Sequence, residues 1–279
     1  MTPAVSVRGL RKEYPGHVAV EDVALEIEQG EVFSLLGPNG AGKTTTVEIL
    51  EGHRKRTAGE ARVLGEDPGT TGRAWRARIG IVLQTANDAA QLTVGETVRH
   101  FARYYPDPRD PEDVLAKVGL TEKARTRVRA LSGGQRRRLD VALGIIGNPE
   151  LLFLDEPTTG FDPEARRQFW TLIKSLAAEG TTILLTTHYL DEAEALADRV
   201  AVLAAGRIVA EGTPSSLGGR SRDDAVVRWR DENGFHEERT QFPTKLVTEL
   251  SNGRELADLT VSRLSLEDVY LRLIEAPHE

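Results

Sequence analysis

The chain of 279 residues contains no cysteine and no long uninterrupted apolar run. Without cysteine it can form neither a disulfide framework nor a thiolate metal site, and this composition fits a reducing compartment. A helix that crosses a bilayer needs about 20 largely apolar residues. The most apolar stretch, residues 139–154, is broken by Asp140, Asn148, Pro149 and Glu150. Any role at a membrane is therefore expected to depend on a partner chain.

An excess of basic charge is also missing. The chain has 36 Lys and Arg against 43 Asp and Glu, which gives a formal net charge of -7. Non-specific nucleic-acid binders usually present a strongly basic face, so we expect no nucleic acid among the partners. The first 14 residues include Arg8, Arg11, Lys12 and Glu13 and no apolar core, and we expect no secretory signal there.

Apolar patterning predicts two kinds of strand. Residues 5–30 alternate apolar and polar side chains around a turn at Pro15 and Gly16, which predicts two or three antiparallel strands. Continuous apolar runs predict buried strands at 31–36, 79–83, 151–154 and 182–187. A helix is expected over 163–178, and because it joins two of these strands, the unit predicts parallel pairing.

Residues 86–148 depart from this pattern and predict a mostly helical subdomain inserted in the α/β core. Within it, Thr93 and Glu96 fit a capping box at one helix start. Residues 199–209 predict a hairpin. The Pro-, Ser- and Gly-rich residues 213–221 then predict a hinge.

The C-terminal part predicts a small separate unit. Around Trp229, apolar residues alternate with arginines as in a half-exposed strand, and Ser265 and Asp268 fit the cap of a final helix. The expected fold class is α/β: a mixed-sheet core, an N-terminal antiparallel β subdomain, an inserted helical subdomain and a C-terminal α+β appendage. We expect one large domain at 1–216 and a small accessory domain at 217–279.

A glycine-rich loop lies between a predicted buried strand and a predicted helix. Residues 37–44 read Gly-Pro-Asn-Gly-Ala-Gly-Lys-Thr and match G-x-x-x-x-G-K-[ST] in full. The glycines let backbone N–H groups curl around phosphates, and the helix start adds its positive end. Lys43 is expected to reach the β- and γ-phosphates of ATP, and Thr44 to hold Mg²⁺. The expected nucleotide contacts are Gly37, Pro38, Asn39, Gly40, Ala41, Gly42, Lys43, Thr44 and Thr45.

Two carboxylates follow the apolar run 151–154. A buried strand would deliver Asp155 and Glu156 to the sheet edge where the phosphate loop lies. Asp155 is expected to complete the Mg²⁺ shell, and Glu156 to orient and deprotonate the attacking water. A solvated turn before Pro157 is the other interpretation of these residues, and the phosphate loop upstream favours the first.

Residues 131–139, Leu-Ser-Gly-Gly-Gln-Arg-Arg-Arg-Leu, narrow the choice of family. They resemble the signature of ATP-binding-cassette (ABC) proteins, and the resemblance covers about residues 5–215. It implies a P-loop NTPase cassette with a RecA-like core that hydrolyses ATP with Mg²⁺. It also implies that two cassettes pair head to tail, with the signature of one chain on the ATP of the other. The signature residues that would contact that ATP are Ser132, Gly133, Gly134 and Gln135.

The same resemblance implies roles for single residues. Gln84 matches the glutamine that contacts Mg²⁺ and water, His188 the histidine at the γ-phosphate, and Tyr14 the aromatic that stacks on adenine. Asp162 matches the loop that crosses the dimer interface, and Phe161 stands beside it where leucine is usual. Taken alone, His188 and Tyr14 fit a structural role as well. The implied catalytic residues are Lys43, Gln84, Glu156 and His188, and the implied Mg²⁺ ligands are Thr44, Gln84 and Asp155.

The C-terminal segment indicates a class within that family. Residues 263–270 resemble the tail of the daunorubicin-resistance, ABC-2 type exporters, with Leu264 where that class often has proline. The resemblance implies an ATPase subunit that powers export of a drug, antibiotic or lipid-like molecule. It would act at the cytoplasmic face of the membrane, with a transmembrane permease on a separate chain and a second cassette, as a homodimer. An importer subunit, or a soluble cassette protein acting on ribosomes or DNA, stays open as an alternative.

Basic residues gather beside the signature, at Arg125, Arg127, Arg129 and 136–138. We interpret them as a solvated face next to the signature helix. A patch for nucleic acid or acidic headgroups is the alternative.

Overall fold

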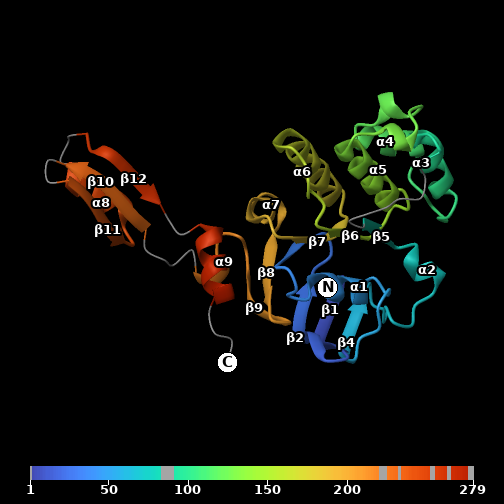
Figure 1. The fold of residues 1–279 in the computed structure, drawn as a ribbon, viewed down its shortest axis with the longest axis horizontal. Coiled ribbons are helices and arrows are strands. Elements are labelled where there is room, and N and C mark those ends of the chain that lie inside the picture. Colours follow the sequence, from blue (N-terminus) through green and yellow to red (C-terminus); the bar gives the residue numbers. More distant parts are fainter. Residues whose placement is uncertain are drawn as a thin grey trace.

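The computed structural model describes residues 2–82, 91–219, 225–231, 234–251, 255–262 and 265–275. Its main body is built on a nine-stranded sheet with the order β4-β1-β2-β9-β8-β3-β7-β6-β5 (Figure 1). These strands are β1 Val5–Tyr14, β2 His17–Ile27, β3 Val32–Leu36, β4 Ala58–Val63, β5 Ile79–Val82, β6 Leu151–Asp155, β7 Thr182–Thr187, β8 Arg199–Ala204 and β9 Arg207–Gly212. The predicted α/β class with a mixed-sheet core is confirmed.

The first two strands form the predicted antiparallel pair. β1 pairs with β2 along its length and ends with Tyr14 opposite His17, so the chain turns at Pro15 and Gly16. Gly16 has φ 77°, a left-handed conformation that glycine adopts without strain. β4 joins the other side of β1, also antiparallel. β8 and β9 form the predicted hairpin at the other end of the chain's cassette region.

The remaining core strands run parallel. β3 pairs with β7 and β8, and β6 pairs with β5 and β7. Every residue of β3 and β7 is buried, as their continuous apolar runs predict. Because parallel strands finish at the same edge of a sheet, Leu36, Asp155 and Thr187 bring the ends of β3, β6 and β7 side by side. The candidate site begins at this edge.

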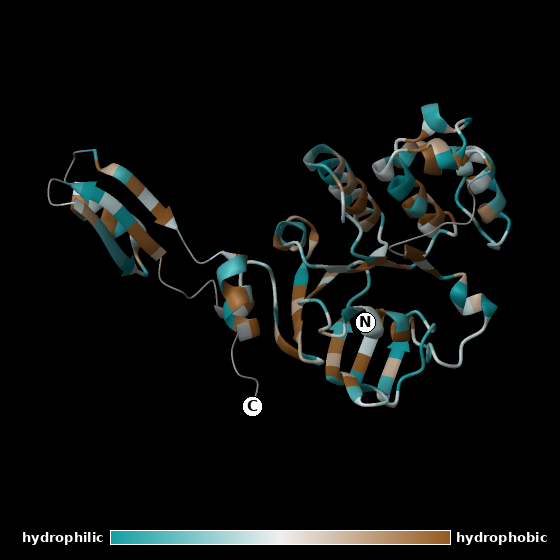
Figure 2. Ribbon diagram, in the orientation of Figure 1, coloured by the Kyte–Doolittle hydropathy of each residue, from teal (hydrophilic) through white to brown (hydrophobic). Residues whose placement is uncertain are grey.

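Helices cover both faces of the parallel strands (Figure 1). Phe153 faces the cluster that includes Leu50 of α1, whereas its neighbour Leu154 faces the cluster that includes Ile145 of α5 and Phe169 of α6. Figure 2 shows the hydrophobic residues concentrated along these central strands. The helices that pack directly on the sheet are α1 Lys43–Leu50, α2 Arg73–Arg76, α5 Gly133–Ile145, α6 Pro163–Ala178 and α7 Leu190–Leu196.

The helical insertion between β5 and β6 is confirmed for residues 91–148. Thr93 caps its first helix: the Thr93 hydroxyl accepts from Glu96 N at 3.3 Å, and Thr93 N donates to the Glu96 carboxylate at 2.8 Å. The insertion holds α3 Val94–Ala102, α4 Pro111–Lys117, η1 Thr121–Lys123, η2 Val128–Ala130 and α5.

The C-terminal residues form a three-stranded antiparallel sheet, order β11-β10-β12, which Figure 1 shows apart from the main body. Its elements are β10 Ala225–Asp231, β11 Gly234–Thr240, α8 Pro243–Ser251 and β12 Ala257–Ser262. The buried Trp229 between exposed arginines confirms the predicted alternation in β10. Nowhere in the described ranges is a helix both long and apolar enough to span a membrane.

The last helix, α9 (Leu266–Glu275), packs on the main body instead of on this small sheet. Ser265 caps it as predicted: Asp268 N donates to the Ser265 hydroxyl at 3.0 Å, and Ser265 N donates to the Asp268 carboxylate at 2.8 Å. Leu266 is buried in one cluster with Leu36 of β3 and Leu217 of η3 (Leu217–Gly219). The predicted hinge is described only as far as this short helix, so the hinge and the boundary at residue 216 stay predictions.

Candidate functional site

The loop between β3 and α1 has the backbone expected of a phosphate cradle. Gly40 and Gly42 have φ of 81° and 104°, values that other residues rarely adopt. A Cβ atom on Gly42 would lie 2.3 Å from the carbonyl oxygen of Ala19, so a larger residue would displace backbone. Gly42 caps α1 without a side-chain hydrogen bond. Among the described residues, no side-chain cap satisfies the first N–H groups of α1, and an anion in the loop would do so.

Lys43 is folded back on this loop. Its Nζ donates to the carbonyl oxygens of Gly37 at 2.8 Å and Pro38 at 3.2 Å, and lies 3.8 Å from Oε1 of Glu156. Only 6% of the side chain is exposed. This burial lowers the pKa of Lys43, while the carboxylates of Glu156 and Asp155 oppose the shift. One ammonium thus joins the glycine loop to the acidic turn after β6.

The acidic turn is fixed by Thr186 of the neighbouring strand β7. The Thr186 hydroxyl donates to the Asp155 carboxylate at 2.5 Å, and Glu156 N lies 3.1 Å from both the hydroxyl and the carbonyl oxygen of Thr186. Glu156 has φ 43°, a left-handed conformation that costs a non-glycine residue about 1–3 kcal/mol. The contacts with Thr186 hold that conformation, with the Asp155 carboxylate bonded to Thr186 and the Glu156 carboxylate near Lys43.

His188 follows β7 and lies near the carboxylate oxygen of Glu156 that does not face Lys43. Its Nδ1 lies 3.3 Å from Oε2 of Glu156, and its ring lies 4.1 Å from that of Tyr189. The side chain of His188 is 38% exposed and that of Glu156 is 17% exposed. Glu156 therefore stands between a buried ammonium and an imidazole that solvent or substrate can reach. A carboxylate in this position can accept a proton from water.

Hard oxygen ligands for a divalent cation lie at the same edge. Thr44 is exposed in the first turn of α1, and Asp155 ends β6 as a half-buried carboxylate. Mg²⁺ prefers hydroxyl, carboxylate and water oxygens and is commonly bound by one or two protein groups together with phosphates. The donors present therefore fit Mg²⁺. The third expected ligand, Gln84, lies outside the described residues.

The signature residues form a helix start away from this cluster. The Ser132 hydroxyl accepts from Gln135 N at 3.3 Å, and Ser132 N donates to the Gln135 side chain at 3.1 Å, which makes a capping box. Within the described ranges, no hydrogen bond joins residues 132–135 to residues 37–45, and Figure 1 shows α5 and α1 on opposite sides of the sheet. Because the Ser132 hydroxyl accepts in the box, its proton stays available to an anion.

Two further predicted residues are placed by local contacts. Tyr14 ends β1, and two cations lie over its ring: Lys12 Nζ at 5.0 Å and the Arg54 guanidinium at 5.4 Å from the ring centroid. Asp162 caps α6, and its carboxylate accepts from two backbone N–H groups of the first turn, at 3.0 and 2.8 Å. Phe161 packs edge-on against Phe169, so the aromatic at this position is accommodated in the core.

Arg137 is a residue of the site that sequence reasoning missed. The interpretation of residues 136–138 as a solvated face is wrong for Arg137, which is 8% exposed. Its Nε donates to the carbonyl oxygen of Pro157 and its Nη2 to that of Asp155, both at 2.9 Å. Helical spacing was the available signal, because Arg137 lies on the same stripe as the buried Val141 and Ile145.

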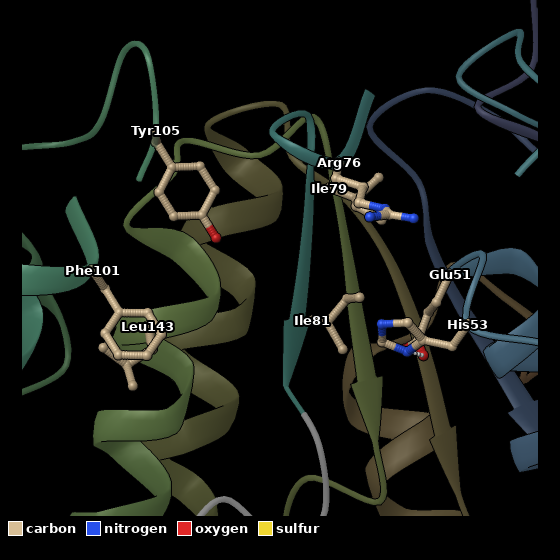
Figure 3. Close-up of a pocket in the computed structure, with 8 residues that line it drawn as sticks. All are labelled: Glu51, His53, Arg76, Ile79, Ile81, Phe101, Tyr105 and Leu143. Carbon is tan, nitrogen blue, oxygen red and sulfur yellow. Dashed lines mark ion pairs between the residues drawn. The ribbon is translucent and has the colours of Figure 1, made fainter. Parts of the chain in front are cut away.

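A separate cavity of about 190 Å³ lies beside β5, at the junction of the sheet and the helical insertion (Figure 3). Figure 3 shows Glu51 and His53 on one wall, Phe101 and Leu143 on the other, and Ile81 between them. The lining residues are Glu51, His53, Arg76, Ile79, Ile81, Phe101, Tyr105 and Leu143. Its lining is mixed: four apolar side chains and Tyr105 stand beside Arg76, His53 and an acidic corner at Glu51.

Glu51 makes that corner unusual. Its side chain is 2% exposed, and its carboxylate lies 3.3 Å from Nδ1 of His53. Burial raises the pKa of Glu51 to about 8, and the negative charges of Asp155 and Glu48 act in the same direction. Nothing in the sequence pattern marked this residue, because its position at the end of α1 gives no sign of its burial.

Comparisons with known proteins bear on this site. The sequence profile of the family described as "ABC transporter" matches residues 20–159. The chain is 46% identical, over 77% of its length, to the Nod factor export ATP-binding protein I of Ralstonia nicotianae and covers 69% of that relative. It is 38% identical to the daunorubicin/doxorubicin resistance ATP-binding protein DrrA of Streptomyces peucetius, over 99% of this chain and 94% of DrrA.

Solved structures agree on the fold. An ATP-binding subunit of an ABC transporter superposes with a TM-score of 0.73 and 23% identity, covering 97% of this chain and 99% of its own. A dimeric ATP-binding cassette in a post-hydrolysis state with ADP and Pi gives a TM-score of 0.68 and 26% identity, covering 75% of this chain and 98% of its own.

Proposed function

The chain belongs to the ABC transporter family, and we propose that it is the ATP-hydrolysing subunit of an exporter whose membrane-spanning part lies on a separate chain. The family profile and the curated relatives confirm the family and exporter-type resemblance that the signature and tail indicate. The relatives bear the names of exporter subunits, which favours export over import and over action on ribosomes or DNA. As an ABC ATPase, the chain hydrolyses ATP.

The position of Glu156 carries the proposed mechanism. It stands 3.8 Å from Lys43 and 3.3 Å from His188, at the edge where the phosphate loop begins its helix. Glu156 would orient the attacking water and accept its proton. Lys43 would leave the carbonyl oxygens it now binds and neutralise the β- and γ-phosphates. His188 would contact the γ-phosphate from the solvent side.

The remaining site residues would bind and orient the nucleotide. Residues 37–45 would wrap its phosphates with backbone N–H groups, and Tyr14 would stack on adenine. Thr44, Asp155 and Gln84 would hold Mg²⁺. That ion would supply electrostatic stabilisation of the transferred phosphoryl group.

The signature supports a pair of chains as the working unit. Ser132 begins a capped helix whose hydroxyl proton is available, yet α5 and α1 lie on opposite sides of the sheet in one chain (Figure 1). A second chain placed head to tail would bring Ser132, Gly133, Gly134 and Gln135 to the phosphates held by residues 37–44 of the first. We propose a homodimer, and we place it at the cytoplasmic face of the membrane.

The cavity beside β5 offers the concave surface on which we place the membrane partner. It combines an apolar wall, Phe101 and Leu143, with the buried carboxylate of Glu51. A helix end of the partner could seat there, between the sheet and the helical insertion that would move on closure. By analogy with the names of its relatives, we propose a drug-like or lipid-like cargo.

Replacing Glu156 by Gln tests the proposal. The amide keeps the size of the side chain but cannot accept the proton, so kcat for ATP hydrolysis should fall by on the order of 10³-fold. ATP should still bind, and the variant should accumulate as a closed pair on size-exclusion chromatography with ATP. The exposed residue Glu60 provides the control, and Glu60→Gln should leave kcat unchanged. Near-normal turnover by Glu156→Gln would contradict the proposed mechanism.

A further inference from the structure

The acidic turn after β6, which carries Asp155 and Glu156, is held by a third element besides β6 and β7. Arg137 of α5 is buried, and its guanidinium donates to the carbonyl oxygens of Asp155 and Pro157, both at 2.9 Å. These two carbonyl oxygens flank Glu156 on either side along the chain. The planar fork of a guanidinium suits such paired contacts, because its donors have a fixed spacing.

The backbone that Arg137 holds is one that would not keep its shape alone. Glu156 has φ 43°, which a glutamate adopts only where its surroundings impose it. Thr186 fixes the N–H side of this residue at 3.1 Å, and Arg137 fixes the carbonyl oxygens before and after it. The direction of the Glu156 side chain therefore depends on where α5 stands.

The same helix begins with the signature. Ser132 caps α5, and Arg137 lies five residues further on, within the first two turns. An α-helix of this length moves as a rigid body, so a shift at Ser132 is carried to Arg137. On the proposed function, Ser132 would contact the nucleotide of the partner chain, whereas Glu156 acts on the nucleotide of its own chain.

We propose that Arg137 is the positioning residue through which the signature contact on one ATP sets Glu156 for hydrolysis of the other. The inference rests on the proposed head-to-tail pair and goes beyond it. Each chain would be switched on by its partner's nucleotide through a path inside its own fold: Ser132, α5, Arg137 and the acidic turn. A buried arginine that only stabilised the cassette would leave the two events independent.

The first measurement is the steady-state ATPase of three single variants. Arg137→Met keeps the apolar stem and removes both donors, and kcat should fall by on the order of 10²-fold because the base is misplaced. KM should change by less than about threefold, because the residues that bind nucleotide are untouched. Arg137→Lys can still reach one carbonyl oxygen and should recover part of kcat. Arg138→Gln is the matched control on the same helix, since Arg138 bonds Gln168 and not the acidic turn, and it should behave as the parent protein.

A double-mutant cycle then separates positioning from stability. If Ser132 acts through Arg137, the kcat of the double variant Ser132→Ala/Arg137→Met should fall by much less than the product of the fold losses of the two single variants. The kcat of the control double variant Ser132→Ala/Arg138→Gln should equal that of Ser132→Ala alone. Multiplied losses in the Arg137 cycle, or a kcat of Arg137→Met within about threefold of the parent, would overturn the proposal. If Arg137→Met does not fold, the same cycle with Arg137→Lys decides.

Failure of the proposed function would look different. It would show as an unmodified chain that does not hydrolyse ATP, or as normal turnover by Glu156→Gln. The Arg137 proposal fails on its own when the parent hydrolyses ATP and Glu156→Gln does not, but one of two further results is seen. Either Arg137→Met keeps kcat within about threefold of the parent, or the losses in the Arg137 cycle multiply.

Discussion

The main body and the C-terminal sheet differ in how much of their side-chain surface is buried. In the main body, β3 and β7 have no exposed residue, and their side chains enter clusters on both faces of the sheet. In the small sheet, every residue of β12 is exposed and α8 has no buried residue. Burial fixes the first region, and backbone pairing with a few apolar contacts around β10 fixes the second.

This difference shows where the two regions divide. Leu217 and Leu266 stand on either side of the small sheet in the sequence, yet both are buried in one cluster with Leu36 of β3. The chain thus leaves the main body after η3 and returns to it with α9. We propose that the accessory unit comprises residues 225–262, and that α9 belongs to the nucleotide-binding part.

The largest expected effect on the free energy of unfolding concerns Glu51, a carboxyl group buried in the main body. The carboxyl of Glu51 has a pKa of about 8 because it is buried, with Asp155 and Glu48 acting in the same direction and His53 nearby. The folded chain therefore binds a proton that the unfolded chain has released, so the free energy of unfolding falls as pH rises from about 4.5 to 8. Glu51→Gln cannot ionise and should be more stable than the parent above pH 8, by up to about 5 kcal/mol.

Urea unfolding at pH 5 and pH 9 measures this effect. The stabilities of Glu51→Gln and the parent should be similar at pH 5 and diverge toward pH 9. Glu28 is exposed just after β2, and Glu28→Gln should follow the parent at both pH values. Equal pH dependence in Glu51→Gln and the parent would show that Glu51 is solvated in the folded protein, which would contradict the burial on which the comparison relies.

The next effect tests whether α9 belongs with the main body. Leu266 is 1% exposed, and shortening it to alanine should lower the free energy of unfolding of the nucleotide-binding part by about 2–4 kcal/mol, because a cavity remains beside β3. Leu271 on the same helix is 43% exposed, and Leu271→Ala should change it by less than about 0.5 kcal/mol. Thermal unfolding of the parent and of each variant, followed with and without ATP, measures the two changes in the free energy of unfolding. Equal effects of the two substitutions would place α9 outside the core.

The sequence predicts the main body better than its connections. Periodicity and turn residues locate β1, β2 and α6, because each pattern reports its own local burial, and the loop 37–44 carries its chemistry in consecutive residues. The contacts of Arg137 and the burial of Glu51 depend on segments far apart in the chain, so no local pattern shows them. The packing of α9 was missed for the same reason. Ser265 predicts where the helix begins, but no local pattern predicts that it packs against Leu36 and Leu217.

The smallest expected effect concerns the accessory unit itself. Replacing residues 225–262 by a Gly-Ser linker removes the small sheet and α8 but keeps Leu217 and Leu266 to pack together. Among the described residues, the strands of that sheet share no buried cluster with the main body. The free energy of unfolding of the nucleotide-binding part should therefore change by less than about 1 kcal/mol, and kcat by less than about threefold. Truncation after residue 216 is the contrasting variant. It also removes η3 and α9, exposes the side of β3 that leads into the phosphate loop, and should lower both stability and turnover. If the linker variant loses as much as the truncation, the small sheet supports the catalytic region directly and the division drawn between the two regions is wrong.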